Sequence, residues 1–307
     1  MKIIVTGGAG FIASHIVDEY IKAGHKVVVI DNLLTGFRRN LNPKAKFYRA
    51  DIRDLAAMEK IFKKERPETV NHHAAIAEVI KSLRDPIPTL ETNVIGIANV
   101  LVAFGHYGRG GKKRKFIFSS TGGAMYGAAK HLPANENELP ITLSPYGLSK
   151  HLGEEVVKYY ARSFGFDYFI FRYANVYGPR QNPKGEAGIV AIFGGMMKKG
   201  ITPTIFGDGS KGRDYVYVGD VARANMLALR RGKNEIVNIG RGILVTDKEI
   251  SDAVAHAVGF TQTVKYAPYR KGEIYRITLD ARKARRVLGW KPRMDFKKGI
   301  RNAVATV

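Results

Sequence analysis

The chain has 307 residues, 45% hydrophobic and 25% charged, a balance typical of globular proteins and not of disordered or fibrous ones. It has no cysteine, which excludes disulfides and thiolate chemistry, and no apolar run that approaches a membrane span or signal core, so we expect a cytoplasmic protein without a membrane partner. The net charge of +23 comes from scattered basic clusters without a nucleic-acid motif, so solvated surfaces are favoured over a specific nucleic-acid partner.

The first thirty residues predict a strand, a glycine turn, a helix and a second strand. An apolar run over residues 3–5 stops at Gly7, apolar residues then recur at helical spacing until Gly24, and a β-rich run covers 27–31. In such a βαβ unit Gly7 allows the tight turn. Gly10 lets the backbone approach a pyrophosphate at the helix N-terminus.

Asp31 ends the second strand of this unit. A carboxylate there can accept hydrogen bonds from an adenosine ribose and would repel a 2′-phosphate, so the sequence favours NAD over NADP. Ala13, at the third position of the fingerprint, still permits close packing of helix on strand. The alternative is a helix start without a ligand, because turns collect glycine for steric reasons.

Strands and helices keep alternating up to residue 172, which predicts a Rossmann-type doubly wound parallel sheet in an α/β fold. We expect residues 1–172, completed by parts of 211–241, to form an NAD-binding domain. Residues 173–307 are then mainly a smaller, mixed α/β substrate lobe. Further strands are predicted at 46–50, 69–72, 115–120 and 168–172, and helices at 54–64, 90–104 after a break at two prolines, and 145–164.

The strongest catalytic signal is Tyr146-Gly-Leu-Ser-Lys150. Residues four apart share a helix face, so the phenol and the ammonium can converge. A free tyrosine has a pKa of ~10 and is a poor base, but a nearby ammonium and an oxidised nicotinamide favour the phenolate. Thr121, at the hydroxyl-bearing end of the 115–120 strand, could hydrogen-bond the same reacting oxygen. The tyrosine–lysine spacing is common on ordinary helices, so it indicates a catalytic role only in combination with the dinucleotide fingerprint.

An ordered set of motifs covers essentially the whole chain: TGGAGFIASH, HHAA, TNVIG, FIFSSTGGAMYG, SPYGLSK, RYANVYGPRQ, IFGDG and RDYVYV. This set resembles the extended short-chain dehydrogenases/reductases, and among them the nucleotide-sugar epimerases of the UDP-glucose 4-epimerase group. The resemblance implies an NAD-dependent isomerase that inverts C4 of a UDP-hexose, UDP-glucose or UDP-galactose, through a transient 4-keto intermediate. It also implies a homodimer in which the helices near 90–104 and 145–164 pair with their copies.

The resemblance also assigns roles to individual residues. Thr121, Tyr146 and Lys150 would be catalytic, and no metal is implied. The residues that would bind NAD are Gly7, Gly10, Phe11, Ile12, Asp31, Asn32, Asp51, Ile52, Ala74, Ala75, Asn93, Ser119, Tyr146, Lys150 and Tyr173. The residues that would bind the UDP-sugar are Thr121, Asn175, Arg213, Arg270 and Glu273, with Ile277 limiting the room around C2 of the sugar.

Alternatives remain at the level of substrate and of class. UDP-glucuronate or a UDP-N-acetylhexosamine could be the substrate, and a non-catalytic NAD-binding or nucleic-acid-binding protein is the other class. Departures from the family pattern are Ala13, His73, Gly219 and Glu273. The dehydratase acid pair and the decarboxylase glutamate are missing after Thr121, where Gly122-Gly123-Ala124 follow. His72 and His73 are adjacent on a strand and point to opposite faces, which favours a structural role over a metal site.

Overall fold

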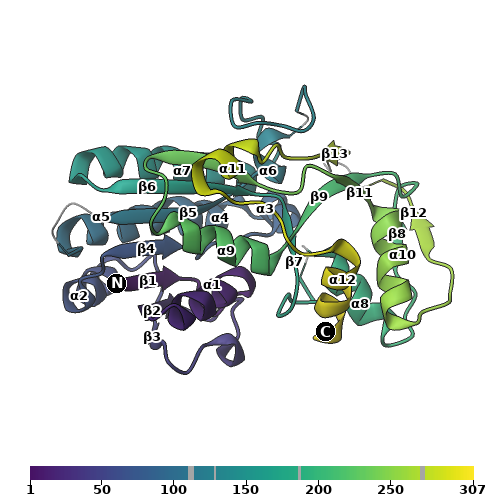
Figure 1. The fold of residues 1–307 in the computed structure, drawn as a ribbon, viewed down its shortest axis with the longest axis horizontal. Coiled ribbons are helices and arrows are strands. Elements are labelled where there is room, and N and C mark those ends of the chain that lie inside the picture. The colour runs from purple at the N-terminus through teal and green to yellow at the C-terminus, as the bar shows by residue number, and fades with distance from the viewer. Residues whose placement is uncertain (110–113, 128, 186–187, 270–273) are drawn as a thin grey trace.

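A computed structural model describes residues 1–307 except 110–113, 128, 186–187 and 270–273. Within these residues the largest sheet has seven strands, all parallel, and it confirms the predicted doubly wound α/β fold (Figure 1). From one edge to the other its strands are β10 (Glu235–Ile239), β6 (Asp167–Tyr173), β5 (Lys115–Thr121), β4 (Thr69–His72), β1 (Lys2–Thr6), β2 (Lys26–Asp31) and β3 (Lys46–Arg49).

The order of these strands reverses beside β1. The chain passes from β1 through β2 to β3, and β4 then pairs with the other side of β1. Open α/β sheets bind their ligands beyond the carboxyl ends of the strands at such a reversal. Thr6, the last residue of β1, pairs there with His72, the last residue of β4. The segments that follow these two residues are therefore the ones placed to bind a ligand.

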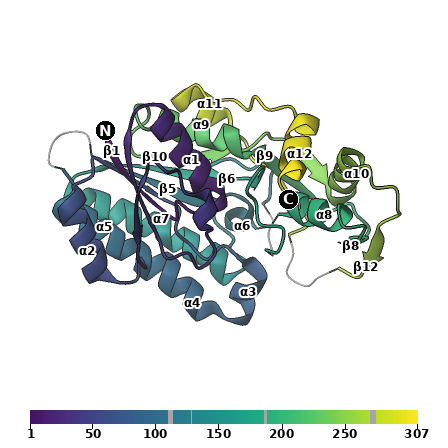
Figure 2. The same cartoon turned by 90° about the horizontal axis from the view of Figure 1, so that it is seen from below.

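Helices cover both faces of the sheet, because successive strand residues point to opposite sides. Ile3 and Val5 pack into one core cluster and Ile4 packs into the other. Figure 2 shows α1, α9 and α11 on one side of the sheet and α2, α5 and α7 on the other. These helices are α1 (Phe11–Lys22), α9 (Val218–Ala228), α11 (Arg282–Leu288), α2 (Leu55–Glu65), α5 (Gly96–Tyr107) and α7 (Pro145–Phe164), with the short η1 (Arg38–Asn40), α3 (Val79–Arg84) and α6 (Gly123–Tyr126) between them.

Beyond β6 the chain builds a second, smaller group of elements around its own apolar cluster. One small sheet joins β7 (Asn175–Tyr177), β9 (Gly212–Tyr217), β11 (Leu244–Thr246) and β13 (Arg276–Ile277), and another joins β8 (Thr204–Phe206) to β12 (Lys265–Ala267). The helices here are α8 (Ile189–Met197), α10 (Asp247–Val258) and α12 (Phe296–Ala305). Between these elements the chain returns once to the large sheet to form β10, beside β6.

The helix expected from residue 90 begins earlier, at Pro86. Pro86 occupies the first helical turn, where its fixed φ suits the helix and its missing N–H costs nothing, so the two prolines do not break the helix. α4 (Pro86–Leu90), the π-helical turn η2 (Glu91–Ile95) and α5 form one helical stretch. By length and composition Pro86–Tyr107 is apolar enough to cross a membrane, contrary to the expectation of no such run. Part of it packs against the sheet, with Val100, Leu101 and Phe104 fully buried.

Candidate functional site

The glycine turn after β1 has the geometry that a pyrophosphate requires. Gly7 has φ +70°, and a Cβ there would lie 2.7 Å from the backbone nitrogen of Ala74, so only glycine fits. Gly10 caps helix α1 without any side-chain hydrogen bond. The first N–H groups of the helix, those of Phe11 and Ile12, therefore have no side chain in front of them. The contact with Ala74 also places the segment after β4, Ala74-Ala75, beside this turn.

Asp31 ends β2 at the same edge of the sheet. Its carboxylate accepts hydrogen bonds from the backbone N–H groups of Ala9 (3.0 Å) and Leu33 (2.8 Å). Burial raises its pKa, and these two hydrogen bonds act in the opposite direction. The side chain is thus fixed next to the glycine turn, where a ribose attached to a bound pyrophosphate would lie. Such a carboxylate suits NAD and disfavours a 2′-phosphate.

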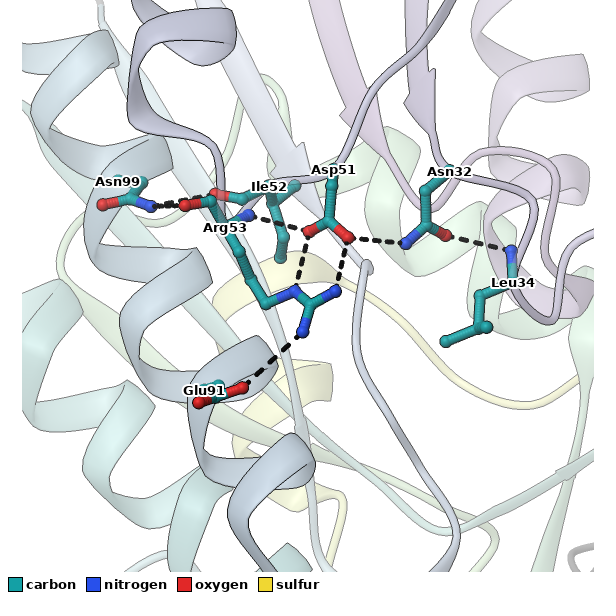
Figure 3. A network of polar contacts seen from close by, with 7 residues as sticks. All are labelled: Asn32, Leu34, Asp51, Ile52, Arg53, Glu91 and Asn99. Carbon is teal, nitrogen blue, oxygen red and sulfur yellow. Dashed lines mark hydrogen bonds and ion pairs between the residues drawn. The ribbon is translucent and has the colours of Figure 1, made fainter.

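A charged network surrounds Asp51, which follows β3 (Figure 3). Arg53 donates to both carboxylate oxygens of Asp51, at 3.1 and 2.9 Å, and Asn32 donates at 3.1 Å. On its other side Arg53 lies 3.6 Å from Glu91 on η2. The hydrogen bonds from Arg53 lower the pKa of Asp51 to about 2. Asn99 holds the loop by donating to the carbonyls of Ile52 and Arg53.

The three predicted catalytic residues converge at the carboxyl end of β5 and the start of α7. Burial raises the pKa of the Tyr146 phenol to about 12, against a smaller lowering by hydrogen bonding with Thr121. Lys150, one helical turn beyond Tyr146, donates to the carbonyl of Ser119 at 2.8 Å. Burial lowers the pKa of the Lys150 ammonium to about 7. Phenol, threonine hydroxyl and ammonium are thus gathered in one partly buried site, in which Lys150 is 4% exposed.

Asn93, which is predicted to contact NAD, has its side chain held by three hydrogen bonds within the protein. Its carboxamide bonds to the backbone N–H and carbonyl of Ile76 at 2.8 and 2.9 Å and donates to Ser149 on α7 at 2.9 Å. Ser149 in turn donates to the carbonyl of Tyr146. Asn93 is 3% exposed. The side chain therefore joins the loop after β4 to the catalytic helix.

Tyr173 ends β6 beside Thr121, its partner across the two strands. Its ring is 6% exposed and stacks on His73, with 5.9 Å between centroids. Its hydroxyl accepts from Asn225 at 2.8 Å and lies 3.3 Å from the His73 Nε2 atom. His72 bonds Thr6 through Nδ1 at 2.9 Å. Both histidines are therefore engaged structurally, and the described residues contain no cluster of three metal-ligating side chains.

Asn175 and Arg213, which are predicted to bind the UDP-sugar, stand on neighbouring strands, β7 and β9. Ile277 of β13 pairs in register with Arg213, and with Asn175 and Gly123 it lines a small hollow next to the catalytic strand end. Asp214, the next residue of β9, is 1% exposed and accepts a hydrogen bond from the backbone N–H of Arg241. The other two predicted substrate residues, Arg270 and Glu273, lie outside the described residues.

Two charged pairs that support the site, Arg53 with Glu91 and Glu154 with Arg172, were not predicted from the sequence. Glu154 lies at four and eight residues from Lys150 and Tyr146, so it continues their helix face, and this spacing could have revealed it. Arg172 and Glu91 carried no local signal, because their partners are distant in the sequence.

Comparison with known proteins agrees with this geometry. The model of the NAD dependent epimerase/dehydratase family matches residues 3–240. The structure of a UDP-glucose 4-epimerase with UDP-glucose from Thermotoga maritima is 47% identical, with a TM-score of 0.96 over 100% of this chain and 98% of that one. A Thermus thermophilus UDP-glucose 4-epimerase in complex with NAD is 43% identical, with a TM-score of 0.94 over 100% and 98%.

A third structure is relevant to substrate choice. A UDP-N-acetylglucosamine 4-epimerase from Methanobrevibacter ruminantium, in complex with UDP-N-acetylmuramic acid, is 33% identical, with a TM-score of 0.91 over 99% of this chain and 97% of that one. The family match, the structural neighbours and the dinucleotide cradle agree with one another. The chain belongs to the NAD dependent epimerase/dehydratase family, as an epimerase that uses NAD.

Proposed function

We propose that the protein interconverts UDP-glucose and UDP-galactose by NAD-dependent epimerisation at C4. The observation that carries this proposal is the convergence of Thr121, Tyr146 and Lys150 at the edge of the sheet that also holds the glycine turn and Asp31. The similarity to two UDP-glucose 4-epimerases of known structure supports the same substrate.

In this proposal Tyr146, as a phenolate, removes the proton of the sugar 4-hydroxyl, and Thr121 hydrogen-bonds the same oxygen. Burial alone disfavours the phenolate. The Lys150 ammonium, one turn away, favours it through its positive charge. NAD, when bound, takes up and returns the hydride at C4. The protein must then let the 4-keto sugar present its other face before the proton returns from Tyr146.

The same proposal assigns the binding residues. Phe11, Ile12 and the turn before them would hold the pyrophosphate, Asp31 the ribose, and Asp51 with Ile52 the adenine. Asn175 and Arg213 would hold the UDP-sugar. The free N–H groups of α1 and the fixed carboxylate of Asp31 support the cofactor part of this assignment.

A turnover panel tests the function directly. Purified protein should convert UDP-glucose into UDP-galactose without added cofactor, and the denatured protein should release NAD. The panel also includes UDP-glucuronate and UDP-N-acetylglucosamine. UDP-N-acetylglucosamine should be a poorer substrate than UDP-glucose, because the branched Ile277, which lines the hollow beside Asn175, leaves little room for an N-acetyl group at C2. Released NAD without epimerisation of any of the three sugars would refute the proposal.

Epimerisation of a UDP-N-acetylhexosamine is the second candidate. It is supported by the similarity to the UDP-N-acetylglucosamine 4-epimerase from Methanobrevibacter ruminantium. Ile277 is 2% exposed, so a substrate with an N-acetyl group would have to displace it. Similar kcat/KM for UDP-glucose and UDP-N-acetylglucosamine would favour this second candidate.

The outer faces of the long helices support the proposed homodimer. α4, η2 and α7 expose apolar side chains at helical spacing, namely Ile87, Ile95, Leu148, Leu152 and Tyr159. A second copy covering them would form a four-helix bundle and would explain why the Pro86–Tyr107 stretch is so apolar. Light scattering at micromolar concentration should give a dimer mass, and Leu152→Glu should give a monomer. We also propose that residues 1–172, together with parts of 211–241, form the NAD-binding domain and that residues 173–307 mainly form the substrate lobe. A cytoplasmic location is proposed as well.

A further inference from the structure

A fully enclosed ion pair lies behind the catalytic residues. Glu154 of α7 is 0% exposed and Arg172 of β6 is 4% exposed. Arg172 donates to both carboxylate oxygens of Glu154, at 2.9 Å from Nε and 2.7 Å from Nη2. Ser120 of β5 donates a third hydrogen bond to the same carboxylate at 2.6 Å. One carboxylate therefore ties together a helix and two neighbouring strands.

These are the elements that carry the proposed catalytic groups. Ser120 lies between Ser119, whose carbonyl accepts from Lys150, and Thr121, the hydrogen-bond partner proposed for the sugar. The hydrogen bond from Ser120 to Glu154 therefore fixes the strand end that carries Thr121 against the helix that carries Lys150. A shift of this strand along α7 would misplace the threonine hydroxyl relative to the phenol.

Glu154 also supplies a charge at one helical turn from Lys150. Burial lowers the pKa of Lys150 to about 7, and the charge on Glu154 opposes this lowering. The pKa values of both histidines on the β4 side are lowered by burial and by the lysine charge, so they stay neutral at pH 7. Among the described residues, the titratable groups next to Lys150 are His72 and His73 at the end of β4 and Tyr146 and Glu154 on α7, with Arg172 of β6 behind Glu154.

Stability alone gives little reason for this pair. Removing two charges from water is expensive, and apolar replacements of buried pairs are often as stable or more stable. We propose that Glu154 is a positioning residue for the epimerisation, which holds the Thr121 strand end against α7 and stabilises the Lys150 ammonium. The proposal rests on the catalytic trio of the proposed function. Arg172 then orients the carboxylate through its two hydrogen bonds.

The double variant Glu154→Gln/Arg172→Met tests the charge, because it leaves no unpaired buried ion. Without the carboxylate the lysine should lose its proton at lower pH. The high-pH limb of the kcat profile should therefore move down by about one pH unit, and kcat at the wild-type optimum should fall about tenfold. KM for UDP-glucose should stay within about twofold, since neither residue is assigned to the sugar. Glu155→Gln, which alters the neighbouring exposed glutamate paired with Lys158, is the matched control and should keep the wild-type profile.

Ser120→Ala tests the positioning separately and introduces no buried charge. It should lower kcat several-fold and leave the pH limbs in place, because the charge on Glu154 remains. A folded double variant with the wild-type pH profile, or Ser120→Ala with wild-type kcat, would overturn the proposal. If the double variant does not fold, the kcat of Ser120→Ala alone tests the proposal: a several-fold fall supports it and a wild-type value overturns it. Full activity of Tyr146→Phe would instead refute the proposed function, whatever the result at Glu154.

Discussion

Behind the proposed catalytic residues, at what we call the enclosed end of the site, Glu154 and Arg172 are buried, whereas at the proposed adenine end, which we call the exposed end, the side chains of Arg53 and Asp51 are 46% and 28% exposed. Both pairs are two-pronged contacts of an arginine with a carboxylate. In the interior the field of a charge is weakly screened, and breaking a pair costs several kcal/mol. Near the surface a pair contributes about 0–1 kcal/mol. The enclosed end should therefore control the rate, and the exposed end should adjust cofactor affinity only slightly.

The largest effect is expected from Lys150→Met, which removes the ammonium from the enclosed end. Because the Tyr146 pKa is raised by burial, the phenolate depends on nearby positive charge. We expect kcat to fall by about 10²-fold or more, with KM nearly unchanged. Initial rates of UDP-galactose formation at saturating substrate measure this loss.

The stability of the same variant separates lost chemistry from lost folding. The pKa of Lys150 is lowered in the folded state, so between about pH 7 and the unfolded value of about 10.5 the unfolded chain binds more protons. The folded protein is thus penalised at pH 7 and recovers stability as the pH rises. Lys150→Met should raise Tm at pH 7, and this gain should shrink by pH 10. A lower Tm at pH 7 would contradict the assigned burial cost.

Asp31→Ala should have the next largest effect, on cofactor choice. Asp31 is 8% exposed and anchored by two backbone N–H groups, so it resembles the enclosed end more than the exposed one. Hydrogen bonds to a charged group are worth about 1.5–3 kcal/mol, so NAD affinity should fall by about 10–100-fold. The preference over NADP should shrink as well, because the repelling carboxylate is gone. Calorimetry on protein freed of its cofactor checks both, and equal affinity of the wild type for the two cofactors would disprove the assignment.

The difference between the two ends also explains what the sequence could and could not predict. Gly7, Asp31, Tyr146 and Lys150 belong to local patterns, a turn, a strand end and a helix face, so their neighbourhood in the chain was sufficient. The helix 145–164 was predicted with the bounds it has, because Ser144 and Pro145 mark its start and Gly165 its end. The parallel sheet followed from the alternation of elements.

Long-range partners were not predictable in this way. The pairing of Arg172 with Glu154 depends on how β6 packs against α7, and that of Arg53 with Glu91 on how a loop meets a π-helical turn. The engagement of the Asn93 carboxamide by Ile76 and Ser149 likewise arises only from packing. The start of the helix expected at residue 90 was wrong, because Pro86 and Pro88 were interpreted as a break. Proline breaks a helix in its interior but is favourable in its first turn.

Ile277→Ser is expected to have a smaller effect, on the choice of sugar. Ile277 lines the hollow with Asn175 and Gly123, and serine would open space there. Hydrophobic pockets discriminate by about 1–3 kcal/mol, so the ratio of kcat/KM for UDP-glucose over UDP-N-acetylglucosamine should narrow by about tenfold. Val176→Ala, which alters the residue after Asn175 on β7, is a control for a general loss of packing near the hollow. An unchanged ratio would show that Ile277 is only a buried strand residue.

Arg53→Ala should have the smallest effect at pH 7. The pair with Asp51 is solvent-exposed, so we expect NAD affinity to fall by no more than about fivefold, and less at high salt. Arg49→Ala, which alters an exposed arginine at the end of β3, serves as the control. A loss of NAD affinity of about a hundredfold or more would contradict the proposed difference between the two ends, because the exposed end would then behave like a buried site.

The pH dependence of the same variant gives the more specific result. Arg53 lowers the pKa of Asp51 to about 2, so the wild-type carboxylate stays ionised throughout the range in which the protein can be handled. Without the arginine the pKa should return toward the ordinary aspartate value of about 3.9. NAD affinity of Arg53→Ala should therefore fall as the pH drops from 5 toward about 4, where the wild type changes little, because a protonated Asp51 accepts fewer hydrogen bonds. If both proteins lose affinity in parallel, Asp51 does not contact the adenine, and Arg53 only holds the loop after β3.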